Sequence, residues 1–485
     1  MSALGAKVRF ATWKSDPVRV VVVGGGIAGL SAAWFLRQLE PSGEVVVLEG
    51  SPRVGGKLGS VEVGGVTVET GAESVLARRP EAVDLIRAVG LGDDLVHPVT
   101  TSAGMWSRGH VRPLPAEQVM GVPSDLAALA RSGIVSTAGV TRAMAEPVMP
   151  VQPRTEDISV AAYVGDRLGE EIVERMVDPL LGGVYAGHAD QLSMFATLPQ
   201  FARAVTEGVP LTKAAAEIKA ATQPGHVFAG ITGGVARLPG AVAAASGADV
   251  RTGVTVQGLT RTPTGWSLRT RSGLTDEHLA ADAVVVAVPA PAAARLLGDA
   301  VPAAASELAG IEYASMAIVT LVYPPSAGEP PVAGSGFLVP AVDRRLIKAV
   351  TVSSRKWDWL AQAAGRAGSG TVLRASIGRL GEEADLQRDD EDLIHGVAVD
   401  VAHATGLAGS PVDASVHRWG GALPQYTVGH LDRVRRIRAA VDAVPGLAVC
   451  GAAYDGVGIA ACVATARLAA ERIVGAGRPG GTMGA

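Results

Sequence analysis

A glycine-rich turn follows the first apolar run of the chain and carries the clearest chemical signal. Four valines at residues 20–23 lead into Gly24-Gly25-Gly26-Ile27-Ala28-Gly29, and a helix-like segment follows. Gly24 permits a tight turn from strand to helix, Gly26 lets the backbone approach a pyrophosphate, and Gly29 lets the helix pack closely on the strand. The start of the helix attracts anions because its first N–H groups are free and its dipole is positive there. The pattern predicts a dinucleotide phosphate site made by Gly24, Gly25, Gly26, Ile27, Ala28 and Gly29.

A carboxylate stands twenty residues after Gly29, at the end of the second apolar run. Glu49 closes the run at residues 45–48, and Gly50 follows it. A carboxylate at this position accepts hydrogen bonds from both ribose hydroxyls of an adenosine group and disfavours a 2′-phosphate. The competing interpretation is a glycine-rich turn of an ordinary α/β domain, and the register of strand, helix, second strand and acid disfavours it. We therefore expect Glu49 and Gly50 to bind the adenosine half of the dinucleotide.

The next glycine-rich segment changes the predicted cofactor from a nicotinamide to a flavin. After Glu49 come five residues, Gly55-Gly56 and Lys57, and then Glu69-Thr70-Gly71-Ala72-Glu73. This arrangement resembles the amine-oxidase-type flavoprotein superfamily, in which the glycine pair lies against the pyrophosphate and isoalloxazine of FAD. Most members have Arg after the pair, so Lys57 keeps the charge and loses the bidentate fork. The resemblance implies FAD contacts from Gly56, Lys57, Gly71, Ala72, Glu73 and Ser74.

A second strand-turn-helix pattern near the C-terminus predicts a contact with the flavin ring. A short apolar run at residues 447–450 leads into glycines and then into a helix from about Gly458. N–H donors at such a helix start can face the N1/C2 carbonyl edge of the flavin, which becomes negative on reduction. A structural strand-turn-helix without ligand is the alternative. The predicted cofactor contacts here are Val457, Gly458 and Ile459, and Val256 and Trp419 complete the set.

Several further segments resemble the porphyrinogen oxidases of haem biosynthesis. They include residues 156–160, 178–187, 230–235, 336–340, 418–430 and 454–459, and their order and spacing match over residues 18–473. Within this family the chain is most similar to the coproporphyrinogen III oxidases of Gram-positive bacteria. The resemblance implies a six-electron oxidation of coproporphyrinogen III to coproporphyrin III in three flavin cycles, with molecular oxygen as acceptor and hydrogen peroxide as product.

The implied chemistry depends more on orientation and exclusion of water than on a strong side-chain base, because the product is aromatic. We therefore name no catalytic acid or base from the sequence, and we predict no metal site. His188, His417 and His430 are interpreted as structural groups, and Cys450 and Cys462 as buried apolar residues.

The four propionates of coproporphyrinogen require an apolar floor and a cationic rim. Arg79 matches a basic position in the family and is the first candidate. The other predicted substrate contacts are Arg345, Lys348 and Arg355. A solvated surface charge is the competing interpretation for each of these side chains.

Composition excludes charge-driven binding to nucleic acid or to a membrane surface. The chain has 485 residues, a net charge of −4 and an isoelectric point near 6.2. No apolar run approaches the roughly eighteen residues of a membrane span, and residues 1–17 lack the features of a signal peptide, so a cytoplasmic location is expected.

Amine oxidases often tether FAD through a cysteine upstream of the final helix, and residues 422–430 contain none, so we expect non-covalent FAD.

The order of apolar patterns predicts an α/β fold in which a Rossmann-like FAD-binding domain is interleaved with a mixed-sheet substrate domain and a helical insertion. The FAD-binding domain takes residues 17–95, 225–300 and 413–475, the insertion 98–222 and the substrate-binding domain 301–412, while 1–16 and 476–485 are expected to be flexible. Helices are predicted to begin at Ser124 and after residues 157–159. Strands are predicted at 249–256, 265–269, 283–288, 316–322 and 372–377.

Three functions remain open from the sequence. The first is the coproporphyrinogen oxidase, with the porphyrinogen and oxygen as partners and a transient contact with the next haem-pathway enzyme as a further hypothesis. The second is a protoporphyrinogen IX oxidase, or an amine or carotenoid oxidase on the same scaffold. The third is a flavin-binding protein without turnover.

Overall fold

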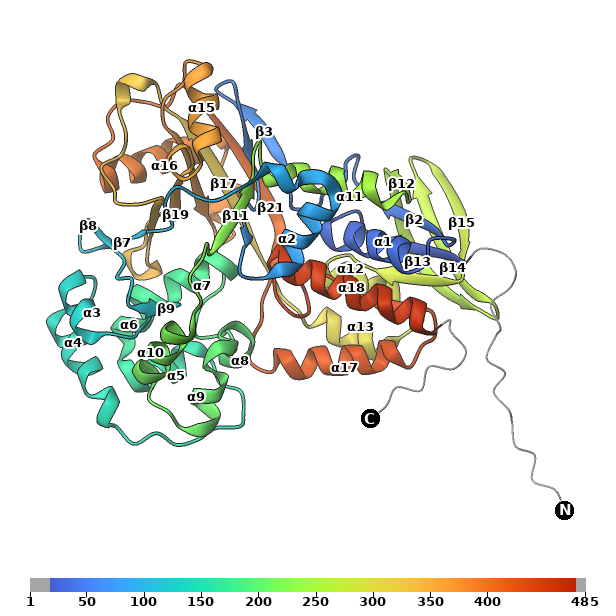
Figure 1. Ribbon diagram of the computed structural model, residues 1–485, viewed down its shortest axis with the longest axis horizontal. Helices are drawn as coiled ribbons and strands as arrows, with labels where there is room; N and C mark the ends of the chain where they lie inside the picture. Colours follow the sequence, from blue (N-terminus) through green and yellow to red (C-terminus); the bar gives the residue numbers. More distant parts are fainter. Residues whose placement is uncertain (1–17, 477–485) are drawn as a thin grey trace.

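A five-stranded parallel sheet forms the frame of the first domain (Figure 1). The computed structural model describes residues 18–476. The ends predicted to be flexible, 1–16 and 476–485, lie outside the described residues except for residue 476. In sheet order the strands are β12 (Asp249–Thr252), β2 (Glu44–Glu49), β1 (Arg19–Val23), β16 (Ala283–Val286) and β22 (Leu447–Val449). The predicted Rossmann-like arrangement is confirmed, including a strand at residues 447–449 that joins the sheet from the end of the chain.

Both faces of this sheet are buried, which explains the continuous apolar runs of its strands. Val20 and Val22 pack with α1 (Ile27–Leu39), α11 (Leu238–Ser246) and α18 (Ile459–Ala476). Val21 and Val23 point to the opposite face and pack with a different set of elements. That set comprises the antiparallel strands β13 (Val254–Thr262), β14 (Gly265–Ser272) and β15 (Thr275–Ala281) and the helices α12 (Ala290–Leu297), α13 (Pro302–Ala309) and α17 (His430–Asp442).

The single strand predicted at 249–256 is two strands. β12 belongs to the parallel sheet, whereas β13 belongs to the antiparallel sheet β13-β14-β15. Gly253 lies between them with φ +69°, a left-handed conformation that redirects the chain. An isolated glycine inside the predicted strand was the available signal for this break.

A seven-stranded sheet forms the second domain. Its order is β21 (Asp413–Pro424), β17 (Tyr313–Val322), β20 (Val372–Ile377), β19 (Ile347–Val352), β18 (Gly336–Leu338), β7 (Gly104–Ser107) and β8 (His110–Pro113). All neighbouring strands are antiparallel except β18 and β7, so the sheet is mixed, as predicted. Ala317, Val319 and Leu321 on β17 pack against α16 (Asp390–Thr405), which leaves the alternate residues to face the other side.

Three strands of this sheet come from segments that the sequence predicts to belong to other domains. Strands β7 and β8 come from the predicted insertion 98–222, and β21 comes from the predicted FAD-binding segment 413–475. Strand β7 pairs with β18 across 233 residues of sequence, and β21 pairs with β17 across 91 to 111 residues. Local patterns carry no information on such pairing, because the paired strands are far apart in the sequence.

The rest of the insertion is helical apart from the short strands β9 (Gln118–Val119) and β10 (Val122–Pro123), and Figure 1 shows it as the compact group containing α3 to α10. Its longest helices are α4 (Thr137–Met144), α5 (Val160–Leu168), α7 (Asp178–Tyr185) and α10 (Leu211–Ala221). Ser159 caps α5 by accepting a hydrogen bond from the N–H of Ala162, as the sequence predicts. The predicted cap at Ser124 is wrong by one residue, because Asp125 caps α3 (Leu126–Ser132) with its carboxylate. No helix within residues 18–476 combines the length and apolar character needed to cross a membrane.

Candidate active site

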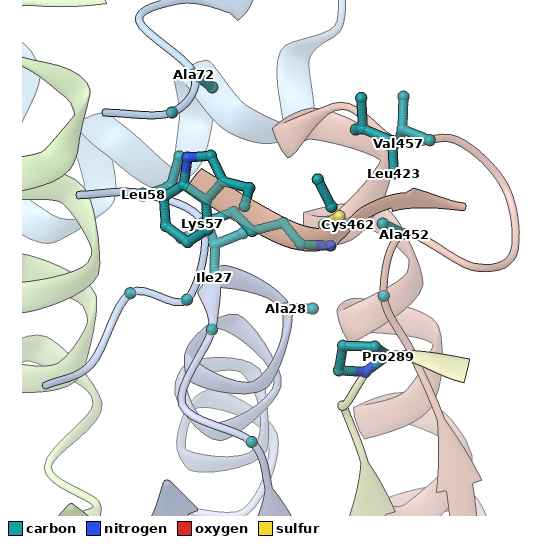
Figure 2. A pocket seen from close by; sticks show the side chains of 18 of the residues that line it. Ile27, Ala28, Lys57, Leu58, Ala72, Pro289, Leu423, Ala452, Val457 and Cys462 are labelled. Atoms are coloured by element: carbon teal, nitrogen blue, oxygen red, sulfur yellow. The ribbon is translucent and has the colours of Figure 1, made fainter. Parts of the chain in front are cut away.

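A cavity of about 1310 Å³ lies at the carboxyl ends of the parallel strands and extends to the open face of the seven-stranded sheet. Every residue predicted to bind the cofactor lines this cavity except Gly25 and Gly29. Its lining therefore brings together four segments that are far apart in the sequence: the turn before α1, the loop around Gly56, the segment from Gly71, and the turn before α18. Figure 2 shows Ile27 and Ala28 at the start of α1 on one side and Val457 and Ala452 on the other.

The glycine turn before α1 has the geometry that close approach of a ligand requires. Gly24 has φ +110°, and a Cβ there would lie 2.6 Å from the carbonyl oxygen of Ala287. A Cβ at Gly29 would lie 1.9 Å from the carbonyl oxygen of Gly24, so only glycine fits. A Cβ at Gly26 would meet its first neighbour at 4.0 Å, which shows open space in front of the helix. The N–H groups of the first turn of α1 consequently face the cavity with room for an anion.

Glu49 is held at the end of β2 by two backbone donors. Its Oε2 atom accepts a hydrogen bond from the N–H of Gly25 at 2.7 Å, and its Oε1 atom accepts one from the N–H of Ser51 at 2.8 Å. A carboxylate offers about four acceptor sites, so capacity remains for two hydroxyl donors from the cavity. Gly25 and Gly29 thus shape the turn and the Glu49 side chain without lining the cavity.

The loop at Gly55-Gly56 lies directly against the start of α1. The N–H of Gly55 donates to the carbonyl oxygen of Gly25 at 2.8 Å. Arg53 braces this loop from outside, donating to the carbonyl oxygens of Gly56 and Leu58 at 3.1 Å each. The glycine pair is therefore fixed along the same edge of the cavity as the turn at residues 24–29.

Lys57 directs its amine into the cavity toward Cys462, as Figure 2 shows. The amine lies 5.5 Å from the centre of the Tyr313 ring, and burial lowers the pKa of Lys57 to about 8. Burial also raises the pKa of Cys462 to about 11, which keeps this free cysteine a neutral thiol.

A buried ion cluster, which the sequence analysis missed, lines the cavity next to Gly71. Glu73 accepts hydrogen bonds from Arg374 at 2.5 Å, from Ser353 at 3.2 Å and from the amine of Lys356. Burial alone would raise the pKa of Glu73, but Lys356 and Arg374 outweigh it and hold the pKa at about 2. Arg374 also donates to the carbonyl oxygen of Gly71 at 2.5 Å, so it ties the flavin-type segment to β20.

Two positive charges and one firmly ionised carboxylate therefore meet at this end of the cavity. Glu69 lies beside them, and burial raises its pKa to about 7 despite the nearby Arg374. The available sequence signal was Arg374, the one charged residue of its predicted strand at 372–377. Arg374 and Ser376 are two residues apart, so they share the face of the sheet that lines the cavity. No comparable signal marked Lys356.

The turn before α18 is braced by a tyrosine. The hydroxyl of Tyr426 accepts a hydrogen bond from the N–H of Gly456 and donates one to the carbonyl oxygen of Ala452, both at 2.7 Å. Val457 from the same turn packs into the core of the helical insertion. The start of α18 is thereby fixed at the cavity, and Val457, Gly458 and Ile459 line it.

The two remaining predicted cofactor residues lie at opposite ends of the lining. The indole N–H of Trp419 donates to the carbonyl oxygen of Thr70 at 2.7 Å, which fixes the ring beside Gly71. Val256 comes from β13, and its neighbour Thr255 would contact a Cβ placed on Gly50. Val256 thus lies near the predicted adenosine end and Trp419 near the seven-stranded sheet.

The second half of the cavity is roofed by the open face of the seven-stranded sheet. The apolar part of this face consists of Met316 and Ile318 on β17, Leu338 on β18 and Ala349 on β19. Gly183 and Val184 of α7 complete it from the helical insertion. Thr351, Arg374 and Ser376 add polar groups. The chamber is large, mostly apolar and bordered by cations.

Of the four predicted propionate contacts, only Lys348 lines the cavity. The side chain of Arg79 is 47% exposed and lies 3.2 Å from Glu81. Arg345 pairs with Asp400 at 3.3 Å, and Arg355 pairs with Glu329 at 2.8 Å. The structure does not bring these three arginines together or place them in the lining, because nearby carboxylates already engage each of them.

The three singled-out histidines are also outside the lining. His430 is fully buried and stacks on Tyr426 with ring centres 3.8 Å apart, and burial lowers its pKa to about 4. His417 packs on Trp419 with ring centres 4.4 Å apart. His188 lies 3.8 Å from Glu382. These contacts suit structural roles.

Comparison with known proteins agrees with this geometry. Residues 27–474 match a family model described as flavin containing amine oxidoreductase. The chain is 36% identical over 464 residues to a coproporphyrinogen III oxidase from Mycobacterium tuberculosis, and the match covers 94% of this chain and 98% of that protein. A coproporphyrinogen III oxidase from Bacillus subtilis is 32% identical over 457 residues, with 92% of this chain and 95% of the relative covered. The chain belongs to the coproporphyrinogen III oxidase family of flavin-containing amine oxidoreductases.

A solved structure supports the fold assignment. The crystal structure of a protein from Exiguobacterium sp. 255-15, described provisionally as a protoporphyrinogen oxidase, is 32% identical and superposes with a TM-score of 0.84, covering 95% of this chain and 99% of that one. Membership of the coproporphyrinogen III oxidase family makes the chain an oxidoreductase with a flavin cofactor. The resemblance found in the sequence is confirmed.

Proposed function

We propose that this protein oxidises coproporphyrinogen III to coproporphyrin III in haem biosynthesis, with non-covalently bound FAD and molecular oxygen, releasing hydrogen peroxide. The observation that carries the proposal is one continuous cavity, which joins a dinucleotide-type turn to an apolar chamber bordered by Lys348, Lys356 and Arg374. A chamber of this kind suits a large macrocycle that is apolar at its centre and anionic at its edge.

The residues of the first half fit FAD. The open space in front of Gly26 and the start of α1 suit the pyrophosphate, and Glu49 keeps acceptor capacity for the ribose hydroxyls. The start of α18 provides N–H groups for the ring carbonyl edge. When bound, the flavin supplies a two-electron acceptor, so a six-electron oxidation requires three cycles.

The residues of the second half orient the substrate and exclude water. Met316, Ile318 and Leu338 offer an apolar surface to the pyrrole rings. Glu73 neutralises only one of the two charges on Lys356 and Arg374, so this end of the chamber retains a positive charge for a propionate. The propionate contacts predicted for Arg79, Arg345 and Arg355 stay predictions without support from the cavity geometry.

A second candidate is oxidation of protoporphyrinogen IX, because the Exiguobacterium protein carries that description. Protoporphyrinogen has vinyl groups in place of two propionates, so a cationic border favours coproporphyrinogen. Steady-state oxidation of the two porphyrinogens side by side, followed by porphyrin fluorescence and peroxide release, tests the proposal. We expect a higher kcat/KM for coproporphyrinogen III. Turnover of protoporphyrinogen alone would overturn the substrate assignment and leave the flavin oxidase intact.

A further inference from the structure

A β-bulge brings two consecutive residues of β19, Lys348 and Ala349, to the cavity. Ile347 pairs with Ile377 and Ala349 pairs with Ser376, so Lys348 is an extra residue in β19 relative to β20. Ile347 and Val350 belong to the core behind the sheet, whereas Lys348 and Ala349 both line the cavity. Without the extra residue, strict alternation would put Ala349 behind the sheet. Bulges of this kind re-aim side chains next to active sites.

The amine of Lys348 is buried without a carboxylate partner. The residue is 3% exposed, and its amine donates to the carbonyl oxygen of Gly378 at 2.8 Å. Within residues 18–476 no carboxylate oxygen lies within ion-pair distance of this amine. The other two cations bordering the chamber, Lys356 and Arg374, are both paired with Glu73. Burial and the nearby Arg379 lower the pKa of Lys348 to about 7, so a large share of this amine is neutral near neutral pH.

The proposed oxidation of coproporphyrinogen III needs a proton acceptor in the same chamber. Each two-electron step removes a hydride from a saturated meso carbon and leaves a cation spread over the adjoining pyrrole rings. Three such steps act on three meso carbons, and the fourth loses its extra hydrogen as a proton to a pyrrole nitrogen by tautomerisation, so the product keeps two N–H groups. The pyrrole N–H of that cation is acidic and must lose its proton before the ring system can conjugate. Glu73 is a weak base with a pKa of about 2, and none of the described histidines lines the cavity. Lys57, whose pKa burial lowers to about 8, also lines the cavity, but it belongs to the segment predicted to bind the flavin, and its amine points toward Cys462 and lies 5.5 Å from the centre of the Tyr313 ring.

We propose that Lys348 is the catalytic base that accepts the pyrrole N–H proton of the porphyrinogen as the hydride leaves. The meso C–H bond breaks, and a bound flavin would accept its hydrogen together with the electron pair as a hydride. The pyrrole N–H bond breaks, its electron pair stays on nitrogen, and a new N–H bond forms on Lys348. The ammonium group then releases the proton to solvent before the next cycle. This role rests on the proposed function, and it differs from the propionate contact predicted from the sequence.

Burial and two charged groups beyond the end of β20, Arg379 and Glu382, determine how the amine of Lys348 titrates. Asp178 of α7 interacts with Arg379 and His188, the Arg345–Asp400 pair lies at the start of β19, and Lys356, Arg374 and Glu73 line the same cavity. Arg379 opposes protonation of Lys348 and Glu382 favours it. Glu382 is shared between Arg379 and His188, which weakens its effect on the amine.

The test separates a base from a fixed cation. Lys348→Arg keeps the charge but cannot deprotonate at working pH. We expect it to bind coproporphyrin III within about threefold of wild type, by fluorescence quenching, and to slow anaerobic flavin reduction by coproporphyrinogen III about a hundredfold. The wild-type reduction rate should rise as pH rises through about 7, and this rise should be absent in the variant.

In Lys348→Ala, added methylamine should restore part of the rate of flavin reduction. Lys213→Arg and Lys213→Ala, at an exposed lysine of α10, are the controls.

Each outcome supports or overturns the inference. Wild-type rates and pH dependence in Lys348→Arg, with weakened porphyrin binding only in Lys348→Ala, would show a propionate contact and overturn the base. A wild type whose flavin reduction does not change between pH 6 and 8 would also overturn it, even if neither variant folds. A wild-type protein that coproporphyrinogen III does not reduce at all would contradict the proposed function itself, which no property of the variants could imitate.

Discussion

Gly25 donates its backbone N–H to the Oε2 atom of Glu49 at 2.7 Å, which joins the turn before α1 to the end of β2. The bond fixes the carboxylate that is expected to hold the ribose. Glu49→Arg removes this acceptor and introduces a group that has only donors. We expect at least a tenfold loss of FAD affinity, because charge-assisted hydrogen bonds are worth about 1.5–3 kcal/mol. The flavin-to-protein ratio after purification measures it, with the exposed Glu62→Arg as control. A normal ratio in Glu49→Arg would refute the assignment.

Gly29→Ala tests the close packing of α1. The new Cβ would lie 1.9 Å from the carbonyl oxygen of Gly24, so backbone must move. We expect a loss of about 1–3 kcal/mol in unfolding free energy together with reduced flavin retention. Gly240→Ala in α11 is a matched control, because a Cβ there meets nothing within 4 Å. That control should be neutral or stabilising by about 0.4–1 kcal/mol. Equal melting temperatures of the two variants would contradict the packing argument.

Tyr426→Phe removes the hydroxyl that bridges Gly456 and Ala452. The N–H of Gly456 would lose its partner, at a cost of about 1–3 kcal/mol if it stays buried. We expect weaker flavin binding and a shifted flavin reduction potential, since the start of α18 is no longer braced. Tyr163→Phe provides the control, because the hydroxyl of Tyr163 is buried without a hydrogen-bond partner. An unchanged flavin potential in Tyr426→Phe would show that the turn holds its shape without the bridge.

Glu73 should make stability depend on acid pH. Its folded-state pKa of about 2 lies below the ordinary value of 4.5, so its contribution is present above pH 4.5 and is lost as pH falls toward 2. The difference corresponds to on the order of 3 kcal/mol. Glu73→Gln should be less stable than wild type at pH 7, and the gap should narrow on acidification. Denaturant unfolding from pH 7 to the lowest pH at which both proteins fold measures this gap, and a constant gap would contradict the ion cluster.

Acid precipitation tests how the flavin is attached. We expect all yellow colour to enter the supernatant, because residues 422–430 contain no cysteine to tether it. Cys462 lines the cavity, but burial keeps it a neutral thiol and therefore a poor nucleophile. Flavin that remains with the precipitated protein would show a covalent bond.

Local patterns predicted the parts of the site whose residues are near each other in sequence. Gly24, Gly29 and Glu49 belong to one strand-helix-strand unit, so their spacing alone defines their geometry. Arg374 and Glu73 meet across 301 residues, and such a contact depends on how two domains pack. The placement of β21 in the seven-stranded sheet has the same cause. The cap at α3 was missed by one residue because Ser124 and Asp125 are both good capping types.

The parallel sheet and the helix pair α1–α18 bring the beginning and the end of the chain together. During translation, α1 is synthesised long before α18. At roughly 5–20 residues per second, residue 459 is made about 20–90 seconds after residue 27. Until then the apolar face of α1 packs against the sheet and α11 but lacks α18, and the cavity lacks its second helix start. A nascent chain therefore lacks part of the cavity, and part of the apolar surface of α1 stays uncovered until synthesis is nearly complete.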